Sequence, residues 1–146
     1  MDTKSKIVKL PLLKRKIAQL RGQGYTIAFT NGCFDILHYG HVRYLEQAKE
    51  GSRRILVVGL NSDRSIRKIK GPSRPIVKET GRAAVLAGLA SVDYITLFDE
   101  DTPVKFGERM CLLIPNSRFQ VLEGAGHFSF LDKPEEFVKI LSGFVK

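Results

Sequence analysis

The chain has 146 residues, and its 24 lysines and arginines outnumber its 15 acidic residues, giving a formal net charge of +9. Apolar residues make up 43% and recur along the chain, which excludes disorder as the main state and suffices for one domain core. There is no run of 18 apolar residues and no apolar signal core in residues 1–9, so we expect a cytoplasmic protein without a membrane partner. Cys33 and Cys111 form no CxxC pattern, which suits a reducing compartment and predicts neither a disulfide nor a zinc site.

The positive charge is concentrated in residues 53–82, which contain nine basic and two acidic residues. Such a block is typical of solvated helix and loop surface, and equally of a surface that binds a small, phosphate-rich ligand. Nucleic-acid binding usually adds aromatic side chains for stacking, and residues 45–93 contain none. We therefore expect no nucleic-acid partner.

Hydrophobic periodicity and turn residues predict that helices and strands alternate. Apolar residues at helical spacing indicate helices over 7–21, 40–50, 63–69, 82–90, 103–113 and 134–145. Apolar runs of β type indicate strands over 25–30, 54–60, 92–98 and 118–123, with a proline-containing loop over 70–80. This order predicts one α/β domain over 1–146, with a parallel sheet of about four strands and helices on both faces. Ligands of such sheets bind outside the carboxyl ends of the strands.

Two histidines follow the first predicted strand. His38 and His41 bracket Gly40 at the start of a predicted helix, and their spacing points them the same way. A helix N-terminus adds free N–H groups and a positive dipole end, so the pattern predicts a site for a polyphosphate. Three alternatives stay open: ordinary surface histidines, a metal site with Asp35 as third ligand, and Cys33 as a nucleophile.

The sequence TNGCFDILHYGHVRYLEQA (30–48), with its HxGH motif, closely resembles the heptose 1-phosphate adenylyltransferase domain of ADP-heptose synthases, in the nucleotidyltransferase superfamily. GLNSDRSIRKIKGPSRPI (59–76) and RAAVLAGLASVDYITLFDEDTP (82–103) extend the resemblance over roughly residues 5–103. It implies a Rossmann-like three-layer α/β/α sandwich with a mainly parallel sheet of four to five strands. It also implies that a sugar 1-phosphate attacks the α-phosphorus of a nucleoside triphosphate and that pyrophosphate leaves.

The resemblance also implies roles for individual residues. His38 and His41 would be catalytic, stabilising the pentavalent phosphorus and the leaving phosphates. Nucleotide binding would fall to Thr30, Asn31, Gly32, Cys33, Phe34, Asp35 and Gly40. Substrate phosphate or sugar groups would be held by Asn61, Lys70 and Arg82. Mg²⁺ would arrive with ATP and bridge its phosphates, without a protein metal cage. Gly81 departs from the family, which usually has an acidic residue at this position. We expect this departure to affect the cap of the local helix rather than the chemistry.

Residues 102–146 instead resemble the C-terminal segment of α/β-hydrolases, with Asp99 (or Asp101) and His127 at the positions of the triad acid and histidine. The Gly-x-Ser-x-Gly nucleophile elbow is absent, so we expect these residues to be vestigial and without hydrolase activity. The serine-threonine segment that grips the triphosphate in the nucleotidyltransferases is also absent, and the chain ends at Lys146 without room for it.

These features suggest a chimera of a nucleotidyltransferase-like part, 1–103, and a hydrolase-like part, 104–146. We expect nucleotide binding to persist and transfer activity to be impaired. The alternative is an engineered α/β scaffold without catalytic activity. A join of this kind would expose an apolar patch, which favours a homodimer.

Overall fold

The computed structural model describes residues 3–100, 103–113, 133–136 and 138–139. The chain divides into two units, Met1–Phe106 and Gly107–Lys146. Helix α5 (Pro103–Leu113) has the predicted range and includes residues of both units. Residues 134–136 and 138–139 are also helical. The preceding elements are η1 (Thr3–Lys6), α1 (Leu10–Gly22), β1 (Thr26–Gly32), α2 (Tyr39–Lys49), β2 (Arg54–Asn61), α3 (Asp63–Lys70), α4 (Glu79–Gly88) and β3 (Tyr94–Phe98).

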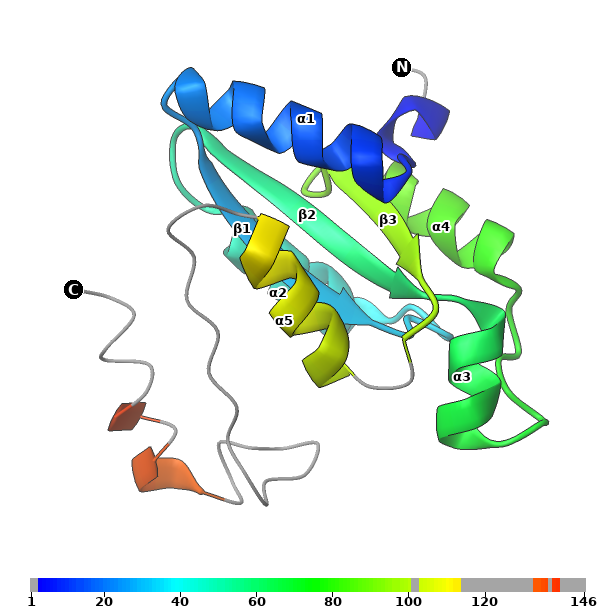
Figure 1. Ribbon diagram of the computed structural model, residues 1–146. Coiled ribbons are helices and arrows are strands. Elements are labelled where there is room, and N and C mark those ends of the chain that lie inside the picture. The colour runs from blue at the N-terminus through cyan, green and yellow to red at the C-terminus, as the bar shows by residue number, and fades with distance from the viewer. Residues whose placement is uncertain (1–2, 101–102, 114–132, 137, 140–146) are drawn as a thin grey trace. The chain divides into compact units, whose positions relative to one another are not determined.

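The three strands form one parallel sheet in the order β1-β2-β3 (Figure 1). Val58 in the central strand faces Thr30 of β1 on one side and Ile95 of β3 on the other. The Rossmann-like α/β fold is therefore confirmed, with three strands in the described part of the chain instead of the four to five predicted. The predicted strand 118–123 lies outside the described residues.

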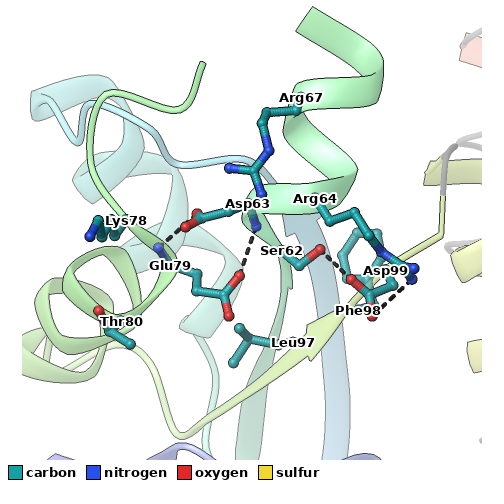
Figure 2. A pocket seen from close by; sticks show the side chains of 10 residues that line it. All are labelled: Ser62, Asp63, Arg64, Arg67, Lys78, Glu79, Thr80, Leu97, Phe98 and Asp99. Carbon is teal, nitrogen blue, oxygen red and sulfur yellow. Dashed lines mark hydrogen bonds and ion pairs between the residues drawn. The ribbon is translucent and has the colours of Figure 1, made fainter. Parts of the chain in front are cut away.

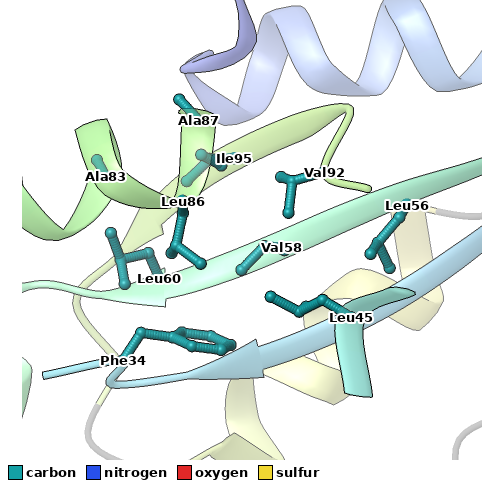
Figure 3. Close-up of a cluster of buried hydrophobic side chains, with 10 residues drawn as sticks. All are labelled: Phe34, Leu45, Leu56, Val58, Leu60, Ala83, Leu86, Ala87, Val92 and Ile95. Atoms are coloured by element: carbon teal, nitrogen blue, oxygen red, sulfur yellow. The ribbon is translucent and has the colours of Figure 1, made fainter. Parts of the chain in front are cut away.

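The central strand β2 is buried on both faces, as its near-continuous apolar run predicts. One face carries the main core, where side chains of β2 and β3 meet side chains of α2 and α4 (Figure 3). Ile95 belongs to this core, whereas Lys16 of α1 lies over the ring of the neighbouring Tyr94. Because successive side chains of a strand point to opposite faces, α1 covers the other face. Leu13 and Ile17 of α1 are fully buried there.

Two helices begin three residues away from their predicted starts, and in each case a contact distant in sequence decides the boundary. Helix α1 begins at Leu10 rather than residue 7, because Ile7 bridges to Ile95 and the Val8 N–H donates to the Ile95 carbonyl at 2.9 Å. Helix α4 begins at Glu79 rather than residue 82, because the Glu79 N–H donates to the Asp63 carboxylate at 2.8 Å. Asp63 thus supplies the N-terminal acceptor that Gly81 cannot provide.

None of the described helices is long and apolar enough to cross a bilayer.

Candidate active site

The HxGH motif forms the N-terminal cap of α2 at the carboxyl end of β1. His38 has extended backbone, and its Nδ1 accepts a hydrogen bond from the Gly40 N–H at 3.1 Å. The His38 carbonyl accepts from the His41 N–H at 3.0 Å and so closes the first turn. An imidazole nitrogen here does the work that Ser or Asp does at most helix N-termini.

The two imidazoles lie together, with ring centroids 4.1 Å apart, and the His41 ring also contacts Phe34 at 5.3 Å. His38 is exposed, whereas the Nδ1 atom of His41 is buried without a hydrogen-bond partner among the described residues. Burial, and secondly the charge of His38, lower the pKa of His41 below its ordinary value. Buried polar atoms are normally paired, so this nitrogen is an exception at the helix end.

The glycine of the motif is required by the position of His38. A Cβ atom at Gly40 would lie 3.0 Å from Cε1 and 3.2 Å from Nδ1 of His38, so a larger residue would displace the imidazole. A similar restriction holds at Gly32, where a Cβ would lie 3.0 Å from the Phe34 ring. Phe34 has a positive φ of 46°, which turns the chain from β1 toward the histidines.

Asp35 is buried and binds protein groups rather than open space. Its carboxylate accepts from the Arg74 side chain at 2.8 Å and from the N–H groups of Ile76 and Val77 at 2.8 and 3.0 Å. Burial alone would raise its pKa, but the hydrogen bonds from Val77, Arg74 and Ile76 prevail and lower it. Asp35 therefore connects the loop that follows β1 to the loop over residues 70–78. The described residues contain no group of three His, Cys, Asp or Glu side chains placed to hold a metal ion.

Arg82 of α4 is buried beside the loop that follows β1, with only 2% of its surface exposed. Its Nη1 donates to the carbonyls of Cys33 at 2.6 Å and Asn61 at 2.8 Å, its Nε to Val77 at 2.8 Å, and its Nη2 to the Asp63 carboxylate at 2.7 Å. The guanidinium thus ties the ends of β1 and β2 to the starts of α3 and α4. These contacts position the loops around the site, and the substrate-binding role that the resemblance implies for Arg82 stays a prediction.

The other predicted site residues surround this network. The Asn61 side chain is buried and donates to Ser65 Oγ at 2.9 Å, while Lys70 is exposed at the end of α3. The Thr30 hydroxyl bonds to that of Tyr44 on α2, and Asn31 is half-buried. Burial raises the pKa of Cys33, opposed by the charges of Lys70 and Arg82, so its thiol is not activated as a nucleophile.

The sequence predicts a strand followed by two neighbouring imidazoles at a helix N-terminus, and the structure has this arrangement. Comparison with known proteins identifies the family of the chain. The cytidylyltransferase-like family model matches residues 29–139. The chain belongs to the cytidylyltransferase-like family. The match begins within β1, includes both histidines and extends well past residue 103. It confirms the nucleotidyltransferase resemblance at the level of the family.

The chain is also similar to parts of individual proteins. The bifunctional protein HldE of Citrifermentans bemidjiense is 52% identical over 109 residues, which are 75% of this chain and 22% of the relative. HldE of Acidiphilium cryptum is 61% identical over 84 residues, 58% of this chain and 17% of the relative. The chain thus spans about a fifth of these relatives. A crystal structure of the lipopolysaccharide core biosynthesis protein from Thermoplasma volcanium GSS1 has a TM-score of 0.49 at 28% identity, covering 64% of this chain and 78% of that chain.

The family match changes the interpretation of the C-terminal segment, because most of residues 102–146 lie inside it. The hydrolase resemblance and the chimera receive no support from it and stay hypotheses. Asp99, the predicted triad acid, ends β3 and accepts from the Ser62 hydroxyl, and its carboxylate lies 3.1 Å from Arg64. The Ser62 hydrogen bond, opposed by burial and aided by Arg64, lowers the pKa of Asp99. His127 and Asp101 lie outside the described residues.

Sequence reasoning missed a cleft of about 580 Å³ at the carboxyl ends of β2 and β3 (Figure 2). The starts of α3 and α4 face each other across it: the Asp63 N–H donates to the Glu79 carboxylate at 2.7 Å and the Glu79 N–H donates back to Asp63. The sequence marks this cleft only by Ser62 and Asp63, which follow a buried strand, and by Lys78 and Glu79 at the start of a helix. That signal is common in α/β proteins, so only the tertiary contact reveals the cleft.

Proposed function

We propose that this family member binds a nucleoside triphosphate at the N-terminus of α2 and transfers its nucleotidyl group to a sugar 1-phosphate. The observation that carries the proposal is the pair of imidazoles at this helix N-terminus, with ring centroids 4.1 Å apart. His38 is exposed and His41 is half-buried, and the buried Nδ1 atom of His41 has no hydrogen-bond partner among the described residues. Buried nitrogens beside a positive helix end favour negative charge that grows on a transferring phosphorus. The nearness to HldE sequences supports ATP and a heptose phosphate as substrates.

In the proposed reaction, a phosphate oxygen of the sugar 1-phosphate forms a bond to the α-phosphorus. The bond from that phosphorus to the bridging oxygen breaks, and pyrophosphate leaves with the electron pair. The protein forms no covalent intermediate, since such transfers depend on positioning and on neutralising charge. His38, His41 and the α2 N–H groups would hold the phosphates, and the Gly32–Phe34 backbone would bring the chain close to them.

We propose that Mg²⁺ would arrive with ATP, whose phosphates would supply most of its ligands, as Mg²⁺ commonly requires. Bound in this way, the ion would neutralise phosphate charge during transfer.

We further propose that these 146 residues alone transfer the nucleotidyl group more slowly than their binding would allow. Residues 103–146 contain three serines and no threonine, and no serine-threonine segment of the kind the resemblance implies for gripping the triphosphate. Loss of one set of transition-state donors costs on the order of 10²–10³ in rate. Cytoplasmic location and a homodimer stay predictions.

Calorimetric titration with Mg²⁺–ATP and Mg²⁺–CTP, followed by an assay of pyrophosphate release with D-glycero-β-D-manno-heptose 1-phosphate, tests the proposal. We expect saturable binding of one nucleotide and slow pyrophosphate release that requires the sugar phosphate. His38→Ala/His41→Ala should abolish both, and His127→Ala, which changes the third histidine of the chain, should change neither. A parent chain that binds neither nucleotide at millimolar concentration contradicts the proposal and leaves the inactive scaffold as the interpretation.

A further inference from the structure

The cleft at the carboxyl ends of β2 and β3 contains charges that the protein does not use. Its three carboxylates are engaged: Asp63 by Arg82 and by the Glu79 N–H, Glu79 by the Asp63 N–H, and Asp99 by Ser62 and Arg64. Figure 2 shows Lys78 on one side of the cleft and the Arg64–Asp99 pair on the other, with Arg67 extending from α3.

Arg67 and Lys78 are exposed, and within the described part of the chain neither has a carboxylate or carbonyl partner. The charge that the cleft can offer a ligand is therefore positive. The two cations come from different segments, the α3 helix and the residue before α4, and both line the same cavity. An anion in the cleft would be the shared partner that the folded chain does not supply.

The rest of the lining indicates which kind of anion fits. Thr80 adds an exposed hydroxyl and Leu97 a half-buried apolar surface, whereas the aromatic Phe98 is only 5% exposed. A nucleobase would need an accessible aromatic or apolar face to stack on. Hydroxyl and charged groups around a small apolar surface suit a sugar that carries a phosphate, and about 580 Å³ is within the usual range of ligand pockets, about 300–1,000 Å³.

The cleft is also connected to the histidine loop. One guanidinium, that of Arg82, bonds to the Asp63 carboxylate in the cleft and to the Cys33 carbonyl in the loop after β1. Because a guanidinium is small, planar and rigid, these two hydrogen bonds keep the Asp63 carboxylate of the cleft close to the Cys33 carbonyl of the loop.

We propose that this cleft is the acceptor subsite, where Arg67 and Lys78 hold a phosphorylated sugar beside the nucleotide. The inference rests on the proposed function, because it assigns the second substrate of that reaction to a place in the fold. The polyphosphate site at α2 and the cleft would then each take one of the two substrates.

The test uses the full chain and measures the two ligands separately by calorimetry. D-glycero-β-D-manno-heptose 1-phosphate is titrated into the parent chain, into Arg67→Gln/Lys78→Gln, and into the charge-matched control Lys14→Gln/Arg15→Gln on the exposed face of α1. Mg²⁺–ATP is titrated into the same three proteins. Since all four residues are exposed, each variant should keep the parent's unfolding transition.

We expect Arg67→Gln/Lys78→Gln to weaken sugar phosphate binding at least tenfold, with ATP binding unchanged and the control like the parent. Equal sugar phosphate affinity in the cleft variant and the parent would overturn the inference, even if ATP binding upholds the proposed function. Equal weakening of both ligands would also overturn it, because the cleft would then not be a separate subsite. A parent chain that binds no sugar phosphate would overturn the inference as well. A parent chain that binds no ATP would instead contradict the proposed function.

Discussion

Two sets of buried polar groups lie at the same edge of the sheet, and they differ in how completely the protein satisfies them. Arg82 donates four hydrogen bonds to protein atoms, and Asp35 accepts three. The Nδ1 atom of His41, at the start of α2, has no partner in the described residues. All three belong to the motifs that the sequence singled out.

The difference separates architecture from binding. A buried charge whose partners are all in the chain stabilises the fold and has little capacity left for a ligand. A buried nitrogen without a partner costs stability, and a ligand outside the chain is one explanation for such a group. We therefore expect substitutions in the first set to change stability, and substitutions in the second to change nucleotide binding.

The largest expected effect is that of Arg82→Met, which leaves three carbonyls and the Asp63 carboxylate without their donor. Removing one partner of a buried charged pair costs about 3–5 kcal/mol in the free energy of unfolding. Chemical denaturation measures it, and Arg15→Met on the exposed surface of α1 is the control, expected within about 0.5 kcal/mol of the parent. A loss below about 1 kcal/mol for Arg82→Met would mean that Arg82 is not the structural link described above.

The next effect is that of Asp35→Asn, with an expected loss of about 1–3 kcal/mol at neutral pH for unsatisfied partners in the loop. Its hydrogen bonds lower the pKa of Asp35, so its contribution is present above the unfolded value of about 3.9 and is lost as the pH falls through the folded value. Unfolding curves between pH 7 and pH 2 should show a weaker acid dependence in Asp35→Asn. An unchanged dependence would assign the acid transition to other carboxylates.

How much of this division was visible in the sequence depends on how far apart the partners are. The HxGH motif and the start of α2 are local, because His38 caps its own helix two residues on, and both were predicted. Three of the four partners of Arg82 are 19, 21 and 49 residues away, so these hydrogen bonds could not be assigned to the protein beforehand. The start of α4 was misplaced for the same reason, since its acceptor, Asp63, lies 16 residues earlier.

A smaller effect on stability, and a larger one on binding, is expected for Gly40→Ala. The new Cβ would displace the His38 ring, 3.0 Å away, and so remove a helix cap worth about 0.5–2 kcal/mol. Nucleotide affinity should fall at least tenfold in calorimetric titration. Gly22→Ala is the matched control, because a Cβ at that helical position meets nothing within 4 Å and should leave affinity unchanged. Parent-like affinity in Gly40→Ala would separate nucleotide binding from the position of His38.

The smallest effect concerns the titration of His41. Its pKa is lowered by burial and by His38, so the folded state disfavours the proton, and stability should decrease as the pH falls below the unfolded value of about 6.5. NMR of the imidazole nitrogens should show His41 titrating below that value in the free protein, and the pKa should rise when Mg²⁺–ATP binds. A pKa that ATP leaves unchanged would place the phosphates away from His41.

The central claim is that the two histidines at the start of α2, rather than the satisfied Arg82 network, receive the nucleotide. The most direct test is the unfolding free energy of the parent and of His38→Ala/His41→Ala, with and without Mg²⁺–ATP at about 100 times the parent's Kd. The account predicts that ATP stabilises the parent by about 2.7 kcal/mol and the double variant by almost nothing. The free double variant should itself be about 0.5–2 kcal/mol less stable than the free parent, because it lacks the His38 cap of α2. Equal stabilisation of both proteins by ATP would contradict the account.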